Sequence, residues 1–518
     1  MAASLELVVD GQRVAVVDED ASLMDVLRGQ LGITSVKDGC SPQGQCGCCT
    51  VWVDGKPRVS CVTPVRRVAG RTITTLEGLS STERDKWTEA FCATGASQCG
   101  FCTPGIIMRL AGLNSHEKAA SALAAHLCRC TGWQTILEAW RCVGATGAKR
   151  NWDAASQRAC IEGGVPQIVG PQIVCGQGGF ADDAAPADAL VALSDGQGGW
   201  VVGETINEAR QLANRVQGRR TPVQQQMPLE FAEGDWAARL RTSWVEPAYL
   251  ETDASWCKPG GQPASPLANG GAFGAKMPSP LPQIARRLAD QHGRTVRVLW
   301  SREDTVRFGP KRPPVAIGIE VDGQGIMRVA RTTDIAKAVA AVAPGLDVQQ
   351  VDVVGPPTSL ALRGVGWVEA SVALSALNAG GARKENQQWF LAPGGGKATA
   401  SWADDRLHVR VRCGEPLDEV VLRSYCIGAA HMAYSWVTSE ALCVDETGEV
   451  HDLTVRSFGI VPATKMPLVE VEIEPSQDPP TNGSDAVFAA TAAAVWRAAG
   501  YPPDWPTGDL SRAVSEHR

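Results

Sequence analysis

Several features that are missing from this 518-residue sequence exclude whole classes of protein. No apolar run approaches the roughly 18 residues needed to span a bilayer. The first residues, MAASLELVVDGQRV, alternate like a strand and lack the basic start and long apolar core of a secretory signal. No basic block offsets the net charge of −7, which argues against a nucleic-acid-binding protein. We therefore expect a cytoplasmic protein with neither a membrane nor a nucleic acid among its partners.

Histidine is also scarce, whereas cysteine is abundant. The 7 histidines form no cluster, so they give little support to a histidine-ligated metal site. The 17 cysteines cannot serve as stable disulfides in a reducing cytoplasm, so a good share of them is expected to bind metal. The apolar content of 44% is that of a soluble globular protein, and the length suffices for three or four domains.

Local patterns predict an α+β multidomain protein. Residues 1–80 alternate like short strands around two Asp-Gly hairpin dipeptides, with a helix start in SLMD at Ser22. Residues 81–155 change to a helical pattern, because apolar residues recur at three- and four-residue steps in DKWTEAFCATGA, PGIIMRLAGL and EKAASALAAHL. A β-rich domain is thus expected to precede an all-α domain.

The remaining chain predicts a linker followed by mixed α/β structure. Residues 156–180 are rich in Gly, Gln and Pro and predict a linker that crosses a surface. A first α/β part is expected over 181–380 and a closing part over 381–518, with a loop at 380–404. The clearest predicted elements are two helices, 204–216 and 279–293, and two strands, 295–301 and 314–323.

The stretch GCSPQGQCGCCTV, residues 39–51, has a density of thiols that ordinary packing does not need. Cys46, Cys49 and Cys61 follow the spacing C-x2-C-x11-C, and Cys40 precedes them. A C-x4-C-x2-C run with a distant fourth cysteine is the plant-type [2Fe–2S] pattern, although the first gap is one residue longer here. The glycines between these cysteines suit a loop that wraps closely around a cluster.

A second set of cysteines comes in two pairs, Cys99-x2-Cys102 and Cys128-x-Cys130, each beside a predicted helix. Two such helices can hold one cluster between them. Taken alone, this set fits zinc about as well as iron–sulfur, but the plant-type loop before it favours two [2Fe–2S] clusters. The other cysteines are expected to pack as small apolar side chains: Cys48, Cys92, Cys142, Cys160, Cys175, Cys257, Cys413, Cys426 and Cys443.

These motifs carry a family resemblance. Residues 1 to about 155 resemble the iron–sulfur subunit of the molybdenum hydroxylases, the xanthine oxidase, aldehyde oxidase and carbon monoxide dehydrogenase family, in KDGCSPQGQCGCCTV, QCGFCTPGIIM and LCRCTGW. The resemblance implies a plant-ferredoxin-like β-grasp domain with one cluster and an all-α domain with the cluster nearer the molybdenum. The family glutamine before CGFC lies beside the pterin, which assigns cofactor binding to Gln98. The implied cluster ligands are Cys40, Cys46, Cys49 and Cys61 for the first and Cys99, Cys102, Cys128 and Cys130 for the second.

From about residue 165 the chain resembles the molybdenum-binding subunit of the same family in shortened form. GFADDAAPADAL, GGAFGAKM, GRTVRVLWSRED and ALRGVGWVEA resemble its pieces in the same order, which implies a reduced α/β molybdopterin-subunit-like region. The family's long central stretch grips the pterin dinucleotide and should fall near residues 384–405. Only GGGKATASW stands there. Met277 replaces the acidic residue of xanthine-oxidising members, which counts against a purine substrate.

The family's catalytic glutamate falls on Asp485, whose side chain is one methylene shorter. A misplacement of about 1 Å can lower turnover on the order of a hundredfold, so no catalytic residue is assigned. The alternative for Asp485 is that it caps the Ala-rich helix that follows. The loop from Gly270 to Gly274 is likewise either an inherited turn or a pterin contact.

The predicted function is therefore that of an electron-transfer subunit in a molybdenum hydroxylase complex. Two [2Fe–2S] clusters would relay electrons from molybdopterin cytosine dinucleotide in a large partner subunit toward FAD in another, during oxidative hydroxylation of an aldehyde or an N-heterocycle. One alternative is a self-contained miniature hydroxylase that binds the pterin through Gln98, the GGAFG loop and Asp485. The other is a redox-sensing or scaffold protein.

Overall fold

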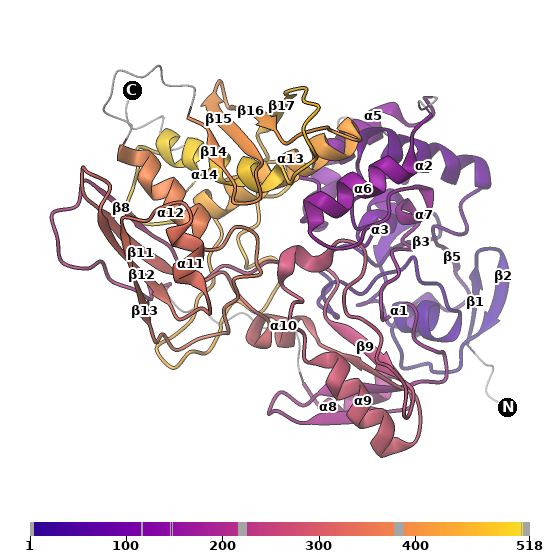
Figure 1. Ribbon diagram of the computed structural model, residues 1–518. Helices are drawn as coiled ribbons and strands as arrows, with labels where there is room; N and C mark the ends of the chain where they lie inside the picture. Colours follow the sequence, from indigo (N-terminus) through magenta and orange to yellow (C-terminus); the bar gives the residue numbers. More distant parts are fainter. Residues whose placement is uncertain are drawn as a thin grey trace.

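The computed structural model describes residues 5–114, 118–145, 147, 149–215, 225–377, 388–508 and 510. In these residues the chain forms four sheets of four or five strands with helices packed beside them, which confirms the predicted α+β multidomain class. In Figure 1 the N-terminal sheet and helices lie on the right, and the second half of the chain lies below and to the left of them. Across the described ranges, no helix is both long and apolar enough to cross a membrane.

The N-terminal sheet has the strand order β2-β1-β5-β3-β4, in which β1 and β5 are parallel and the other neighbours antiparallel. Both Asp-Gly dipeptides form the predicted hairpin turns, with Asp10 and Asp54 in the left-handed region that such turns require. Ser22 accepts a hydrogen bond from the Asp25 amide, as its position predicts. The elements are β1 (Glu6–Val9), β2 (Gln12–Ala15), α1 (Leu23–Asp25), a π turn (Val26–Gln30), β3 (Thr50–Val53), β4 (Lys56–Val59) and β5 (Thr72–Thr74).

The segment that follows is helical, as predicted, although EKAASALAAHL forms only a short helix and a 3-10 turn over its described residues. Trp87 and Trp140 stack with ring centroids 5.4 Å apart and join the first and last of its helices. Its elements are α2 (Ser81–Thr94), α3 (Thr103–Ala111), α4 (Ala119–Ala122), a 3-10 turn (Leu123–Ala125) and α5 (Gln134–Cys142).

The segment predicted as a linker, residues 156–180, is about half helical. Its first part belongs to helix α6 (Trp152–Gly163), and a short helix α7 (Pro171–Val174) follows. The side chain of Arg158 is fully buried, because its guanidinium donates to the carbonyls of Pro416 and Thr481 and pairs with Glu162. A charged side chain can be buried when its donors are matched in this way, and this matching depends on residues far along the chain.

The second half contains three further sheets. The first, β7-β6-β10-β9, carries α8 and α9, and the second, β13-β12-β11-β8, carries α12. Their elements are β6 (Leu190–Ser194), β7 (Trp200–Gly203), α8 (Ile206–Ala213), β8 (Ala238–Arg241), β9 (Ala254–Cys257), α9 (Leu281–His292), β10 (Val296–Leu299), α10 (Arg302–Phe308), β11 (Val315–Ile319), β12 (Gly325–Ala330), α11 (Ile335–Ala340), β13 (Leu346–Val351) and α12 (Trp367–Ser375). The four elements predicted between residues 204 and 323 are all present.

The closing sheet, β14-β15-β16-β17, packs on two long helices, α13 and α14. Its elements are β14 (Phe390–Leu391), β15 (Lys397–Ala403), β16 (Arg406–Arg412), α13 (Glu419–Thr438), β17 (Leu468–Ile473) and α14 (Ser484–Ala498). The prediction of a loop over 380–404 is wrong for residues 388–404, which contain β14 and β15. Residues 380–387 lie outside the described residues. Gly394 to Gly396 form only the turn of a hairpin, since Phe390 pairs with Ala398 across it.

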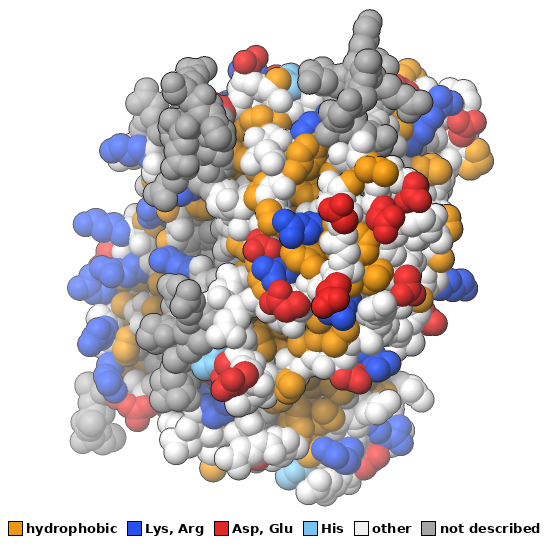
Figure 2. Space-filling model, turned by 90° about the vertical axis from the view of Figure 1, so that its left-hand side faces the viewer, with side chains coloured by type: hydrophobic (Ala, Val, Ile, Leu, Met, Phe, Trp, Pro, Cys, Tyr) orange, Lys and Arg blue, Asp and Glu red, His pale blue; other side chains and the backbone are white. Residues whose placement is uncertain are grey.

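Figure 2 views the side of the molecule on which Figure 1 places β8, β11 to β13 and α12. Apolar side chains gather between scattered acidic and basic ones on this face. Among the large apolar side chains in the second half of the chain, Val354 and Leu391 are more than half exposed, at 63% and 61%.

Candidate iron–sulfur centres

Four of the predicted ligands, Cys40, Cys46, Cys49 and Cys61, form one thiol group, here named the first thiol group. The Cys40 thiol lies beside those of Cys46 and Cys61, and Cys61 also lies beside Cys49. All four are buried. The thiols of Cys46 and Cys61 hold the pKa of Cys40 well below its usual value, because they favour a thiolate there.

Backbone groups of the surrounding loop point at these sulfurs. The Gln43 amide donates to Cys40 Sγ at 3.2 Å, and the Cys61 amide lies 3.5 Å from Cys49 Sγ. Gly39 lies close to the sulfurs, since a Cβ there would be only 3.1 Å from Cys46 Sγ. A close loop with N–H groups aimed at thiolates is the arrangement that holds and tunes an iron–sulfur cluster.

The other four predicted ligands, Cys99, Cys102, Cys128 and Cys130, form the second thiol group. Cys102 stands at the start of α3 and contacts Cys128, while Cys130 Sγ lies 3.7 Å from Cys99 Sγ. The Cys102 thiol lowers the pKa of Cys128 to about 7, helped by Thr131, whose Oγ1 is 3.1 Å from the sulfur. Thus the sequence pairs CGFC and CRC meet, although about thirty residues separate them.

The two thiol groups are adjacent. The Leu127 amide, next to Cys128, donates to the Cys46 carbonyl at 2.9 Å. The ring of His126 packs directly on Gly47, and its Nε2 is 3.1 Å from Thr50 Oγ1. A hydrogen bond therefore joins the backbone of one predicted ligand segment to that of the other.

The number and grouping of the thiols match the ligand sets of iron–sulfur clusters. No group of three or more His, Cys, Asp or Glu side chains within the described ranges is arranged to hold one metal ion. The eight sulfurs are instead linked in two sets of four, with amide donors around them. Four thiolates per [2Fe–2S] cluster is the usual ligand number, so the residues present match this group.

The second half of the chain covers both thiol groups. Arg302, at the start of α10, is fully buried and donates to the carbonyls of Gly39 and Leu250, both at 2.7 Å. Near the second group, Asn269 donates to the carbonyls of Gln98 and Cys99. The thiol groups therefore lie at the junction of the two halves.

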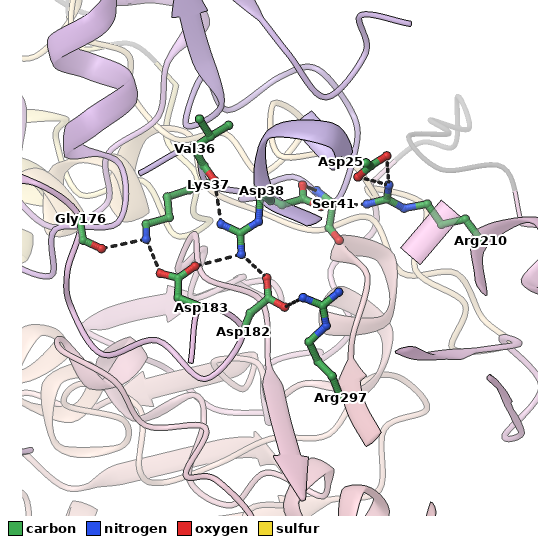
Figure 3. Close-up of polar contacts among 11 residues, drawn as sticks. Asp25, Val36, Lys37, Asp38, Ser41, Gly176, Asp182, Asp183, Arg210 and Arg297 are labelled. Atoms are coloured by element: carbon green, nitrogen blue, oxygen red, sulfur yellow. Dashed lines mark hydrogen bonds and ion pairs between the residues drawn. The ribbon is translucent and has the colours of Figure 1, made fainter. Parts of the chain in front are cut away.

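A partly buried network of charges joins the halves beside the first thiol group (Figure 3). The Lys37 ammonium pairs with Asp183 and donates to a backbone carbonyl. Arg28 pairs with Asp182 at 2.6 Å and with Asp183 at 2.9 Å, and Arg297 pairs with Asp182 at 3.2 Å. The two aspartates belong to the GFADD segment, which is thereby bound to the N-terminal sheet region.

The same network extends to the first predicted ligand. Arg210, from α8, pairs with Asp25 at 2.9 Å and with Asp38 at 3.1 Å (Figure 3). Burial raises the pKa of Asp38 to about 7, and the neighbouring Cys40 adds to this while Arg210 opposes it. Charges of the second half thus reach to within two residues of Cys40.

Gln98 lines a cavity of about 160 Å³ beside the second thiol group. Its side-chain amide donates to the Cys130 carbonyl and to Ser424 Oγ, both at 3.0 Å. Cys99, Cys130 and Asp485 line the same cavity. The structure therefore brings Gln98 and Asp485 to one place, and cofactor binding by Gln98 stays a prediction.

The capping role considered for Asp485 is wrong. Gly483 occupies the N-cap of α14, and Asp485 lies in the first turn, where it pairs with Arg363 at 3.0 Å. The amides of Gly483 and Ser484 are satisfied by the carboxylate of Glu162, at 3.1 and 2.9 Å. Burial raises the pKa of Asp485, against the influence of Arg363.

This cavity alone is small for a pterin dinucleotide. Its volume of about 160 Å³ is below the roughly 300–1,000 Å³ of pockets that enclose a drug-sized ligand. Its lining residues Glu162 and Asp485 are each paired with an arginine, Arg158 and Arg363, so neither arginine is free to bind an anion. The amides at the start of α14, which would suit an anion, bind Glu162 instead.

The GGAFG loop approaches the second thiol group closely. A Cβ on Gly270 would lie 2.6 Å from Cys99 Cβ, so only glycine fits there. Ala272 and Phe273 both adopt left-handed backbone angles, with φ of 52° and 55°. Such strain persists only where surrounding structure enforces it. The loop thus packs against Cys99 and also lines the cavity, so both readings of it, a turn and a pterin contact, stay predictions.

Sequence reasoning missed the buried charges that complete these sites. Arg158, Glu162, Arg302 and Glu440 were missed because each also binds a group more than 250 residues away, which no local pattern shows. Arg363 was visible only as part of the ALRGVG motif.

Comparisons with known proteins agree with this geometry. A family model described as a [2Fe-2S] binding domain matches residues 75–141. The nicotine 6-hydroxylase small subunit of Paenarthrobacter nicotinovorans is 41% identical over 142 residues, which are 26% of this chain and 86% of that subunit. The aldehyde oxidoreductase of Megalodesulfovibrio gigas is 45% identical over 133 residues, 24% of this chain, but the match spans only 15% of that protein.

The likeness in fold extends further. The solved aldehyde oxidoreductase from Desulfovibrio gigas superimposes with a TM-score of 0.69 over 99% of each chain, at 14% sequence identity. That identity supports a shared fold alone. The matches to small subunits such as that of nicotine 6-hydroxylase place the chain in a class of iron–sulfur oxidoreductases.

The chain belongs to the molybdenum hydroxylase family, and it is an oxidoreductase component of that family.

Proposed function

We propose that this chain is the electron-transfer component of a molybdenum hydroxylase complex. It would accept electrons from a molybdopterin centre held by a larger partner and pass them toward FAD in another subunit, while an aldehyde or an N-heterocycle is hydroxylated. The observation that carries the proposal is the convergence of eight cysteines into two adjacent thiol groups.

The thiol groups suit one-electron relay. When bound, each [2Fe–2S] cluster supplies a centre that accepts and releases one electron. The chain's own residues hold the thiolates, keep the first group dry and aim amide donors at its sulfurs. Cys99 and Cys130 of the second group are only partly buried and line the cavity beside Gln98, so an electron donor can approach them from that side.

The poor match of this cavity to a pterin supports a partner that brings the molybdenum centre. Related proteins that this chain covers over most of their length are named as small subunits, among them the nicotinate dehydrogenase small FeS subunit of Eubacterium barkeri, 37% identical, of which 92% is covered. The apolar side chains gathered on the face in Figure 2 offer a surface that a partner subunit would cover.

The self-contained hydroxylase remains the second candidate, because one observation favours it. Gln98, Gly270, Arg363 and Asp485 line the same cavity, as they would if it were a reduced active site. The two candidates differ in whether the pure chain carries molybdenum.

The test is purification of the chain alone, under anaerobic conditions, from cells that supply molybdenum. We expect iron and acid-labile sulfide for two [2Fe–2S] clusters, about four of each per chain. We expect no molybdenum and no oxidation of aldehydes or N-heterocycles. Co-expression with a full-length molybdenum subunit should yield a complex on size-exclusion chromatography. A chain that elutes alone with stoichiometric molybdenum and oxidises an aldehyde would overturn the proposal.

A further inference from the structure

Cys48 is a ninth thiol that lies between the two thiol groups. Its sulfur is close to Cys46: a Cβ built on Gly39 would lie 3.1 Å from Cys46 Sγ and 3.2 Å from Cys48 Sγ. Both sulfurs therefore border the same point beside Gly39. On its other side Cys48 is within electrostatic reach of Cys128 and Cys102 in the second group.

The backbone holds Cys48 firmly in this position. Its carbonyl accepts the Lys37 amide at 3.3 Å, and Gly105 of α3 packs against the same carbonyl so closely that no side chain fits there. The residue is 1% exposed, so water does not compete for its thiol hydrogen.

The thiol hydrogen of Cys48 has two acceptors within reach. The Cys46 carbonyl is 3.9 Å from Cys48 Sγ, at the outer limit for sulfur, and it already accepts the Leu127 amide at 2.9 Å. The Cys46 sulfur is the better acceptor, because a thiolate bound to iron keeps negative charge and has lone pairs free.

We propose that Cys48 is not a cluster ligand but donates its S–H group to the Cys46 sulfur, and so raises the reduction potential of the first cluster relative to the second. This inference rests on the proposed function, since it requires both clusters to be present. Cys48 would be a positioning residue that acts through Cys46.

The direction of the shift in reduction potential follows from charge. A reduced cluster carries one more negative charge than an oxidised one, and a hydrogen bond to a ligand sulfur stabilises the more negative state. Removing the donor therefore lowers the potential of the cluster whose ligand loses it. The second group has its own donors, such as Thr131 at Cys128, and its potential should not move.

The experiment compares Cys48→Ala and Cys48→Ser with the wild-type full chain in EPR-monitored redox titrations. We expect full iron and sulfide content in both variants. In Cys48→Ala the midpoint potential of the first-group signal should shift to more negative values, with the second-group signal unchanged. Cys48→Ser retains a donor and should hold the potential above that of Cys48→Ala. Cys257→Ala, which removes a buried thiol from strand β9, should shift neither signal.

Each other result has a definite meaning. Loss of about half the iron in Cys48→Ala would make Cys48 a ligand and overturn the inference. An unchanged first-group potential, or an equal shift of both signals, would overturn it as well. Absence of iron–sulfur clusters from the wild-type chain would refute the proposed function itself, which the metal analysis detects before any titration.

Discussion

Arg129 and Glu440 form a bidentate ion pair, with Nη1 to Oε1 at 2.5 Å and Nη2 to Oε2 at 2.7 Å. Arg129 stands between two predicted ligands, Cys128 and Cys130, and also donates to the Pro247 carbonyl. Both charged side chains are buried, at 6% and 1% exposure. The pair therefore fixes the CRC segment against the end of α13.

Removing one charge of this pair should lower the stability of the protein. Glu440→Gln leaves the Arg129 guanidinium buried without a counter-charge, which typically lowers stability by about 3–5 kcal/mol. Because Arg129 lies between two second-group cysteines, the second-group EPR signal should also change while the first-group signal stays. Chemical denaturation and EPR of the same samples measure both effects.

An exposed pair provides the control for this variant. Arg331 and Asp352 are linked at 2.5 Å but are 61% and 79% exposed. Asp352→Asn should change stability by no more than about 1 kcal/mol, because solvent screens such pairs. Equal losses of stability in Glu440→Gln and Asp352→Asn would contradict the role given to burial.

Replacing one second-group cysteine should separate the two clusters. Cys128→Ser removes the thiol that contacts Cys102 and Thr131, so one reduced-state EPR signal should disappear. The signal of the Cys40, Cys46, Cys49 and Cys61 cluster should survive. Stoichiometric zinc in anaerobically purified wild-type protein would refute both assignments, and Cys443→Ser, which changes a cysteine outside both groups, should leave both signals in place.

Asp485→Asn should leave the turnover of the assembled complex nearly unchanged. The side chain pairs with Arg363 and does not cap α14, so an amide in its place should alter stability by about 1 kcal/mol or less. Glu162→Gln is the contrasting variant. It weakens a buried pair with Arg158 and should cost several times more, on the order of 3 kcal/mol. A hundredfold fall in turnover for Asp485→Asn, with clusters intact, would favour the self-contained hydroxylase.

Glu251 should make stability depend on pH. Burial raises its pKa from 4.5 to about 7, although Lys276 at 2.7 Å opposes the shift. Between these values the folded state holds a proton that the unfolded state has released, so stability falls as pH rises from about 4.5 to about 7. In Glu251→Gln the free energy of unfolding should fall less between these pH values, by up to a few kcal/mol. Urea denaturation at each pH measures this free energy. The variant should keep part of the pH dependence of stability, because the pKa of Asp38 is also raised to about 7. An identical slope in the variant would refute this assignment.

Much of the N-terminal region could be predicted from local sequence. The two Asp-Gly turns, the Ser22 cap and helices α2 and α3 formed where their patterns indicated, because turn geometry, capping and helical periodicity depend on residues a few positions apart. The cysteine spacing indicated two sets of four thiols for the same reason: each loop must bring its sulfurs around one centre.

What the tertiary structure alone decided concerns contacts between distant residues. The sequence by itself assigned the cysteines of CGFC and CRC to one set, but not Cys48 to a place beside the Cys46 sulfur at Gly39. Nor did it indicate that Glu162 would bind the amides that begin α14, or that a segment rich in Gly, Gln and Pro would bury Arg158. Burying a charge is tolerated only when donors and acceptors from several chain segments meet with matched geometry, and that match exists only in the folded molecule.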